Sequence, residues 1–135
     1  MSTDSFYPQW SSSMAAMKQK TPDIAKAFGG FFQALMKEGA LSVREKELVA
    51  LGIGIAQRCE PCIWSHVEKC LKSGATPEQV LEVAGVAVVI QGGPTYTYIP
   101  RVIAAVEHST NQSAAAHTSP GPPAASVPKA HDADC

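Results

Sequence analysis

Two helix start signals of the same kind frame the central third of the chain, and they constrain its fold more than any other feature. Ser42 stands three residues before Glu45, and Thr76 stands three residues before Gln79. In such a capping box the hydroxyl accepts a hydrogen bond from a free backbone N–H, and the longer side chain reaches back to the N-cap residue. Long apolar segments follow both signals, so each one predicts the start of a buried helix.

The other apolar residues recur at helical spacing, and no segment of the sequence alternates with a period of two. The segment 77–90 is rich in β-branched residues, but its capping box and its length favour a helix over a strand. We therefore predict an all-α fold, a compact bundle of about six helices. The approximate ranges of these helices are 11–20, 22–37, 43–57, 60–73, 77–90 and 95–107.

The helix predicted over 22–37 has Thr21 as its N-cap and Pro22 at its first position. Gly29 and Gly30 weaken this helix, but they would allow a neighbouring element to approach closely. The apolar stripe of the helix consists of Ile24, Ala27, Phe28, Phe31, Leu35 and Met36.

At 135 residues, the chain has room for one folded domain. We divide it into a polar N-terminal segment with a short packing helix over 1–20, a helical domain over 21–108, and a tail over 109–135. The tail is rich in Ala, Pro and Ser without periodicity, which is typical of a disordered segment.

Charge and hydropathy exclude two classes of partner. The sequence has 11 basic and 12 acidic residues with no long run of either sign, so it offers no electrostatic footprint for nucleic acid or an anionic membrane. No stretch reaches the roughly 18 consecutive apolar residues of a membrane-spanning helix, and the first residues lack the pattern of a signal peptide. We therefore expect a cytoplasmic protein that binds neither nucleic acid nor a membrane.

A cysteine pair and a histidine follow the turn between the helices predicted over 43–57 and 60–73. Cys59 and Cys62 are spaced to close a small disulfide ring, and His66 lies one helical turn after Cys62, on the same face. In a reducing compartment such a pair is more often catalytic or metal-binding than structural. The helix N-terminus and the imidazole both favour the thiolate, which is the nucleophilic form of cysteine.

Glu47 lies on the preceding helix, and it would orient His66 if the two helices pack antiparallel across the turn. The i+4 spacing favours Cys62 as the attacking thiol and Cys59 as the resolving thiol. The helix dipole alone would favour Cys59 as the nucleophile. We assign the attack to Cys62 and keep the reverse order as the alternative.

The segment from Glu47 to Gln79 resembles the alkylhydroperoxidase D-like, or carboxymuconolactone decarboxylase, family. The similarity extends over about 22–107, most of the predicted helical domain, and the spacing of the glutamate, the cysteine pair and the histidine is specific to this family. The residues that carry it are Glu47, Cys59, Cys62, His66, Gly74 and Ala75, with the Thr76-Pro77-Glu78 turn and, further on, Gly92-Gly93-Pro94 and Tyr98.

The resemblance implies an all-helical subunit, a proton relay from Glu47 and His66 to the cysteines, and assembly into trimers or hexamers. It also implies an antioxidant enzyme, a thiol-dependent peroxidase or disulfide oxidoreductase that needs no cofactor. Its substrate would be a peroxide or a disulfide, and a thiol compound that the sequence does not identify would donate electrons. Alkylhydroperoxidase D carries a histidine between its cysteines, where this chain has Pro61.

Three other functions remain open. The first is a non-enzymatic helical module whose cysteine pair senses the redox state. The second is metal binding, because Cys59, Cys62, His66 and Glu47 are acceptable zinc ligands in number and type. Structural zinc modules are short and rich in loops, whereas these residues lie on long apolar helices, so we expect no metal. The third is a decarboxylase. It is the weakest alternative, because family members similar to muconolactone decarboxylase lack the cysteine pair that this chain has.

Two further cysteines have simpler interpretations. Cys70 lies roughly 12 Å beyond Cys62 along the helix axis, too far to share a metal ion with it, and we expect a buried, unreactive side chain. Cys135 is expected to be a free, exposed thiol. The helices over 43–57 and 77–90 carry more apolar surface than one small subunit covers, which also predicts a homo-oligomer.

Overall fold

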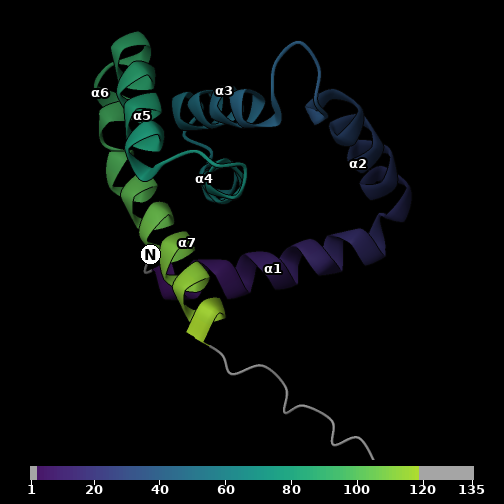
Figure 1. Cartoon of the computed structure of the whole chain (residues 1–135). Helices are drawn as coiled ribbons and strands as arrows, with labels where there is room; N and C mark the ends of the chain where they lie inside the picture. Colours follow the sequence, from purple (N-terminus) through teal and green to yellow (C-terminus); the bar gives the residue numbers. More distant parts are fainter. Residues whose placement is uncertain (1–2, 119–135) are drawn as a thin grey trace, which may run out of the picture.

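A computed structural model describes residues 3–118 of the chain, with side chains from residue 8 onward. Every regular element in this range is a helix (Figure 1), and the prediction of an all-α fold is confirmed. The predicted helices are all present, and α6 is an additional single turn. In chain order, the elements are α1 (Thr3–Lys20), α2 (Pro22–Met36), α3 (Val43–Ala56), α4 (Glu60–Lys72), α5 (Pro77–Gln91), α6 (Gly93–Tyr96) and α7 (Ile99–Thr118).

Both predicted capping boxes are confirmed. At the start of α3, Ser42 Oγ accepts the N–H of Glu45 at 3.1 Å, and Glu45 Oε2 accepts the N–H of Ser42 at 2.6 Å. At the start of α5, Thr76 Oγ1 accepts the N–H of Gln79 at 3.1 Å, and Gln79 Oε1 accepts the N–H of Thr76 at 3.0 Å. The two central helices therefore begin where the sequence places them.

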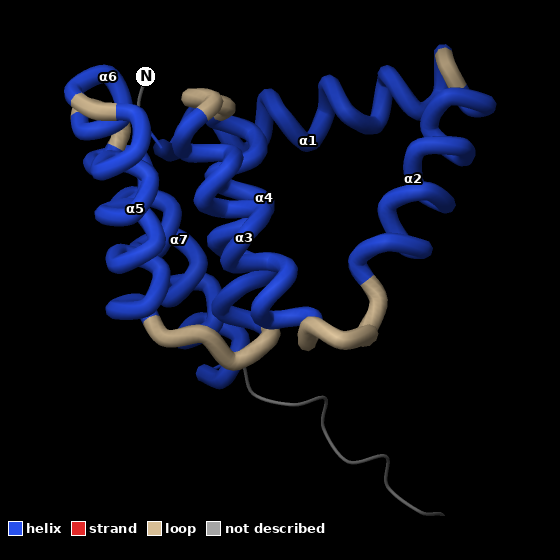
Figure 2. The backbone as a smooth tube through the Cα atoms, turned by 90° about the horizontal axis from the view of Figure 1, so that it is seen from above, coloured by secondary structure: helices blue, strands red, loops and turns tan. Residues whose placement is uncertain are grey.

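The predicted cap of α2 is wrong. Thr21 precedes α2, but its hydroxyl donates to the carbonyl of Met17 at 2.7 Å instead of accepting an N–H of α2. The Thr21 N–H donates to the same carbonyl at 2.8 Å. Both bonds extend the last turn of α1, and α2 then starts in a different direction, so the two helices form a bent arm (Figures 1 and 2).

The last helix is longer than predicted. It continues to Thr118 instead of ending near Glu107, so the predicted start of the disordered tail at residue 109 is too early. Residues 109–118 contain neither proline nor glycine, and the hydroxyls of Thr110 and Ser113 donate to carbonyls four residues back in the helix. The remainder of the predicted tail and Cys135 lie outside the described residues.

Two helix starts also differ from the prediction. α1 begins at Thr3 instead of about residue 11. α7 begins at Ile99 and not at about residue 95, so that Pro100 falls in the first turn, where its missing N–H would have no helical partner. Proline at this position therefore delays the start of α7 without kinking it.

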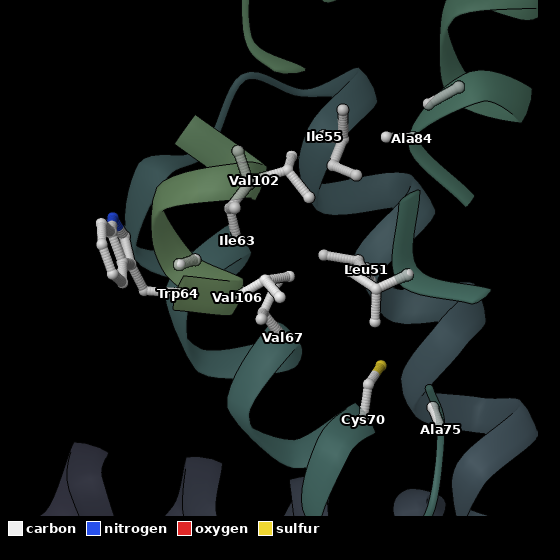
Figure 3. Close-up of a cluster of buried hydrophobic side chains, with 13 residues drawn as sticks. Leu51, Ile55, Ile63, Trp64, Val67, Cys70, Ala75, Ala84, Val102 and Val106 are labelled. Atoms are coloured by element: carbon white, nitrogen blue, oxygen red, sulfur yellow. The ribbon is translucent and has the colours of Figure 1, made fainter. Parts of the chain in front are cut away.

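The hydrophobic core lies between α3, α4, α5 and α7 (Figures 1 and 3). These four helices supply nearly all of the fully buried apolar side chains, and α3 and α4 form an antiparallel hairpin at its centre. The core includes Leu51, Ile55, Ile63, Val67, Cys70, Val80, Ala84, Val102 and Ala105.

The α1–α2 arm stands apart from this core. Figures 1 and 2 both place α2 at the opposite end of the molecule from α5. No residue of α2 is buried. The predicted stripe is present but uncovered within the described chain, since Ile24, Phe28, Phe31 and Leu35 are between 55% and 65% exposed. The bundle is therefore less compact at this end than predicted.

Within residues 3–118, no helix combines the length and the apolar character needed to cross a membrane.

The caps give a first testable prediction. Thr76→Ala removes the hydroxyl that accepts the N–H of Gln79, and we expect it to lower the free energy of unfolding by about 1 kcal/mol. Thr21→Ala is the matched control, because the Thr21 hydroxyl caps no N–H of α2. Urea unfolding at one fixed protein concentration measures both variants, and equal losses would contradict the assignment of the caps.

Candidate active site

The turn between α3 and α4 fixes the position of Cys59 from both sides. The Cys59 N–H donates to the carbonyl of Gly54 at 3.0 Å, and the Arg58 N–H donates to that of Ile55 at 2.9 Å, which closes α3 with a Schellman motif. Arg58 takes the left-handed conformation of this motif, with φ +53°. Cys59 is at the same time the N-cap of α4, where its Sγ accepts the N–H of Cys62 at 3.3 Å.

Cys59 and Cys62 form a disulfide with their Cα atoms 5.2 Å apart. Both residues are half-buried. Gly54 of α3 lies directly behind the pair, because a Cβ atom on Gly54 would approach the Cβ of Cys62 to 3.0 Å. Only glycine lets α3 pack this closely on the redox pair. No pattern in the sequence singled out this position.

Glu47 and His66 are in contact, as the expected antiparallel packing of α3 on α4 requires. His66 Nδ1 lies 2.6 Å from Glu47 Oε2, and their side chains are only 13% and 5% exposed. A carboxylate oxygen at this distance favours, in the neutral imidazole, the tautomer with the proton on Nδ1 and the lone pair on Nε2. The imidazole is thus held in the tautomer that can accept a proton at Nε2.

An aromatic side chain that the sequence did not indicate lies against the His66 ring. Phe32 of α2 stacks on the His66 ring with centroids 6.3 Å apart and planes inclined by 25°. Lys69 lies over the Phe32 ring at 4.3 Å from its centroid. Phe32 is outside the stripe assigned to α2, and only the angle between α2 and α4 brings it to His66.

A second missed cluster surrounds Glu60, the residue after Cys59. Arg101 of α7 donates from Nη1 to Glu60 Oε1 at 2.8 Å, and its guanidinium lies 5.3 Å from the ring centroid of Tyr98. This ion pair is part-buried and joins the first turn of α4 to α7. The separation of 41 residues between the partners left no local signal in the sequence.

Cys70 is a buried residue with no part in the redox pair, as predicted. Its side chain is fully buried, and Figure 3 shows it among the core side chains. Burial, with a smaller contribution from the negative charge of Glu47, raises the pKa of the Cys70 thiol to about 12. The thiol therefore stays protonated at physiological pH.

The other predicted site residues form two pairs, the disulfide between Cys59, the N-cap of α4, and Cys62, and the contact of Glu47 of α3 with His66 of α4. Among the residues that the structure describes, no three His, Cys, Asp or Glu side chains are arranged to hold one metal ion. The arrangement offers a reducible disulfide at a helix N-terminus and an oriented imidazole one turn further along the helix.

The sequence profile of the carboxymuconolactone decarboxylase family matches residues 22–106, which include all four of these residues. The chain belongs to this family. An uncharacterised protein of Cupriavidus necator is 32% identical over 89 residues, 66% of this chain and 79% of the relative. An uncharacterised protein from the cox locus of Paracoccus denitrificans is 28% identical over 100 residues, 74% of this chain and 90% of the relative.

Solved structures of carboxymuconolactone decarboxylase family proteins share the fold. A family protein from Legionella pneumophila matches with a TM-score of 0.72 and 32% identity, over 76% of this chain and 92% of that protein. A family protein from Thermotoga maritima, for which a role in the antioxidative response has been suggested, matches with a TM-score of 0.63 and 27% identity. That match covers 67% of this chain and 94% of the Thermotoga protein.

The buried Glu47–His66 pair gives a second prediction. His66→Leu leaves the Glu47 carboxylate buried without its hydrogen-bond donor, and we expect a loss of about 3 kcal/mol in the free energy of unfolding. The double variant Glu47→Leu/His66→Leu removes both polar groups and should regain a large part of this loss. Urea unfolding at pH 7 measures both, and a double variant no more stable than His66→Leu would argue against a coupled buried pair.

The raised pKa of Cys70 gives a third prediction. At pH 8 a thiol with this pKa is ionised in only about one molecule in ten thousand, so iodoacetamide should label Cys59 and Cys62 of the reduced protein but not Cys70. Peptide mass spectrometry reads out each thiol separately. Unfolding in guanidinium is the control that should make Cys70 reactive, and labelling of Cys70 in the folded protein as fast as of Cys62 would contradict its burial.

Proposed function

We propose that the protein is a thiol-dependent peroxidase or disulfide oxidoreductase that works in a reducing cytoplasm. One observation carries the proposal: a disulfide at the N-terminus of α4 lies one helical turn from an imidazole that a buried carboxylate orients. The membership of the family and the antioxidative role suggested for the Thermotoga relative support it. The assignment of the steps to single residues is ours.

In the first step, Cys62 is the nucleophile and His66 is its base. His66 Nε2 takes the proton of the Cys62 thiol, and the thiolate attacks one oxygen of a peroxide ROOH. The O–O bond breaks, and the leaving alkoxide receives the proton from His66 and departs as an alcohol. The sulfur of Cys62 is oxidised by two electrons to a sulfenic acid.

In the second step, Cys59 resolves this sulfenic acid. The Cys59 sulfur attacks the sulfur of Cys62, and the hydroxyl group leaves as water with the proton of the Cys59 thiol. Cys59 Sγ accepts a hydrogen bond from the Cys62 N–H. This bond favours the thiolate form of Cys59 and so assists the attack. The product is the Cys59–Cys62 disulfide, and a dithiol donor reduces it by two thiol exchanges while the donor itself becomes a disulfide.

The same N–H would also suit Cys59 as the first nucleophile, so the order of the cysteines needs its own test. We favour Cys62 because His66 lies at i+4 from it, whereas His66 lies seven residues from Cys59, roughly 10 Å along the helix axis.

The fourth prediction tests the activity and the order together. The reduced protein should consume hydrogen peroxide or an organic hydroperoxide with a dithiol donor faster than the free dithiol does. Cys62→Ser should abolish this turnover, and His66→Gln should slow it on the order of a hundredfold through loss of the base. A dimedone trap in Cys59→Ser should label Cys62, because the sulfenic acid has no resolving partner.

Cys70→Ser is the control variant, since Cys70 is buried and outside the pair, and its turnover should equal that of the wild type. A sulfenic acid trapped on Cys59 but never on Cys62 would reverse the order of attack. Turnover no faster than the free dithiol and unchanged in Cys62→Ser would favour a non-enzymatic redox sensor. Stoichiometric zinc in protein purified without chelator would favour metal binding. Decarboxylase activity that survives loss of both cysteines would favour a decarboxylase.

A further inference from the structure

The ion pair between Glu60 of α4 and Arg101 of α7 adjoins the redox pair. Glu60 follows Cys59 directly in the chain and occupies the first helical position of α4. Its Oε1 accepts a hydrogen bond from Arg101 Nη1 at 2.8 Å. The Arg101 guanidinium also lies 5.3 Å from the ring centroid of Tyr98, a distance at which a cation–π contact helps to hold it in place. One guanidinium therefore bridges the starts of α4 and α7.

A carboxylate at this position acts on the helix and on the thiol in opposite ways. A negative charge in the first turn of α4 is favourable in the field of the helix dipole. The same charge disfavours the thiolate of Cys59, because two neighbouring anions repel each other. Arg101 offsets this repulsion, since its positive charge cancels most of the field of Glu60 at the adjacent sulfur.

Few other charged side chains approach Cys59 from the turn, from α3 or from α4. Arg58, the preceding residue, is exposed to solvent. Glu47 of α3 and His66 of α4 form a pair of their own at 2.6 Å, and His66 lies seven residues from Cys59, roughly 10 Å along the helix axis. Glu60 is therefore the carboxylate nearest to Cys59 along the chain.

Within the described residues, the helices packed against α3 and α4 add no charged side chain at this end except Arg101. α5 begins at the far end of α4, because only residues 73–76 link the two helices, and both of its glutamates lie in its first two turns. α6 contains no charged residue, and the next charged residue of α7 lies roughly 9 Å beyond Arg101 along the helix. The other titratable residues of these three helices are Glu78, Glu82, Tyr96, Glu107, His108 and His117.

We propose that Arg101 is a positioning residue of the proposed reaction, and that it neutralises Glu60 so that Cys59 can act as a thiolate in the second step. This inference deepens the proposed function and rests on it for the role of Cys59. Arg101 acts through Glu60 and not on the sulfur itself. The pair thereby keeps a first-turn acid on α4 without placing an uncompensated negative charge beside the resolving thiol.

A purely structural ion pair would make the same contacts, but it predicts different variants. Such a pair would only fasten the start of α4 to α7, so loss of either partner would disturb Cys59 in the same direction. Charge cancellation predicts opposite directions. Loss of Arg101 leaves a carboxylate alone beside Cys59 and disfavours the thiolate, whereas loss of Glu60 leaves a guanidinium alone and favours it.

The experiment follows the alkylation of Cys59 as a function of pH in the full chain. The background variant Cys62→Ser prevents the disulfide and keeps the backbone N–H that bonds to Cys59 Sγ. Iodoacetamide is the reagent, because it is neutral and its approach does not depend on the charge of the site. Peptide mass spectrometry measures the rate at Cys59 separately from the rates at Cys70 and Cys135.

The two single variants should move the midpoint of this pH profile in opposite directions. Arg101→Gln should raise the midpoint and Glu60→Gln should lower it, each by about half a pH unit, the effect of one unit charge several ångströms away in a solvated site. The double variant should return close to the starting midpoint. Because the two side chains are 38% and 24% exposed, 1 M NaCl should reduce both shifts.

Two further variants complete the comparison. Arg101→Lys keeps the positive charge and should leave the midpoint near its starting value. Lys72→Gln is the matched control, because it removes the cationic partner of Glu68 at the other end of α4 and should not move the midpoint. Circular dichroism checks the helix content of every variant.

Shifts of the same sign in Arg101→Gln and Glu60→Gln would overturn the proposal in favour of a structural ion pair. The absence of a shift in either variant, or a double variant displaced as far as a single one, would also overturn it. The assay contains no peroxide. A protein without peroxide turnover could therefore still show the opposite shifts, and turnover without these shifts would contradict only the role of Arg101.

Discussion

The close packing of α3 on α4 is the constraint on which the rest of the structure depends. Gly54 lets the two helices approach until a Cβ atom there would lie 3.0 Å from the Cβ of Cys62. The turn that joins them holds Arg58 in a left-handed conformation, which costs about 1 kcal/mol for a residue with a side chain. In return, Cys59 ends the bonding pattern of α3 and caps α4. The redox pair and the centre of the core are thus built by one hairpin.

Much of this hairpin could be predicted because its signals are local. The Ser42 box and the spacing from Cys59 to His66 each act within one or two helical turns, where sequence distance and spatial distance agree. The Glu47–His66 contact was predictable only conditionally, since it needed the antiparallel packing of two helices joined by a short turn. Phe32 and Arg101 reach the site across large sequence separations, and no periodicity of their own helices indicates this.

The errors in the fold have more than one origin. Thr21 is a residue type that often caps helices. Its hydroxyl instead donates to the Met17 carbonyl in the last turn of α1, and this bond replaces the expected cap of α2. The polar composition of residues 109–118 suggested disorder, yet no residue there breaks the helix that Ile99 begins. The stripe of α2 was identified correctly as apolar, but a pattern cannot say whether its own chain covers it. Of these three points, only the last depends on tertiary context.

Burial of Glu47 ties the chemistry to the fold. A buried carboxylate loses its hydration, and a buried ion pair is often no more stabilising than two apolar side chains of the same size. Stability alone therefore gives little reason to hold Glu47 and His66 2.6 Å apart between the central helices. Orientation of the imidazole does give a reason, because a fixed Nδ1–H leaves Nε2 as the proton acceptor on the side chain that follows Cys62 by one turn. The proposed thiol chemistry therefore explains why the core retains this polar pair despite the desolvation of the Glu47 carboxylate.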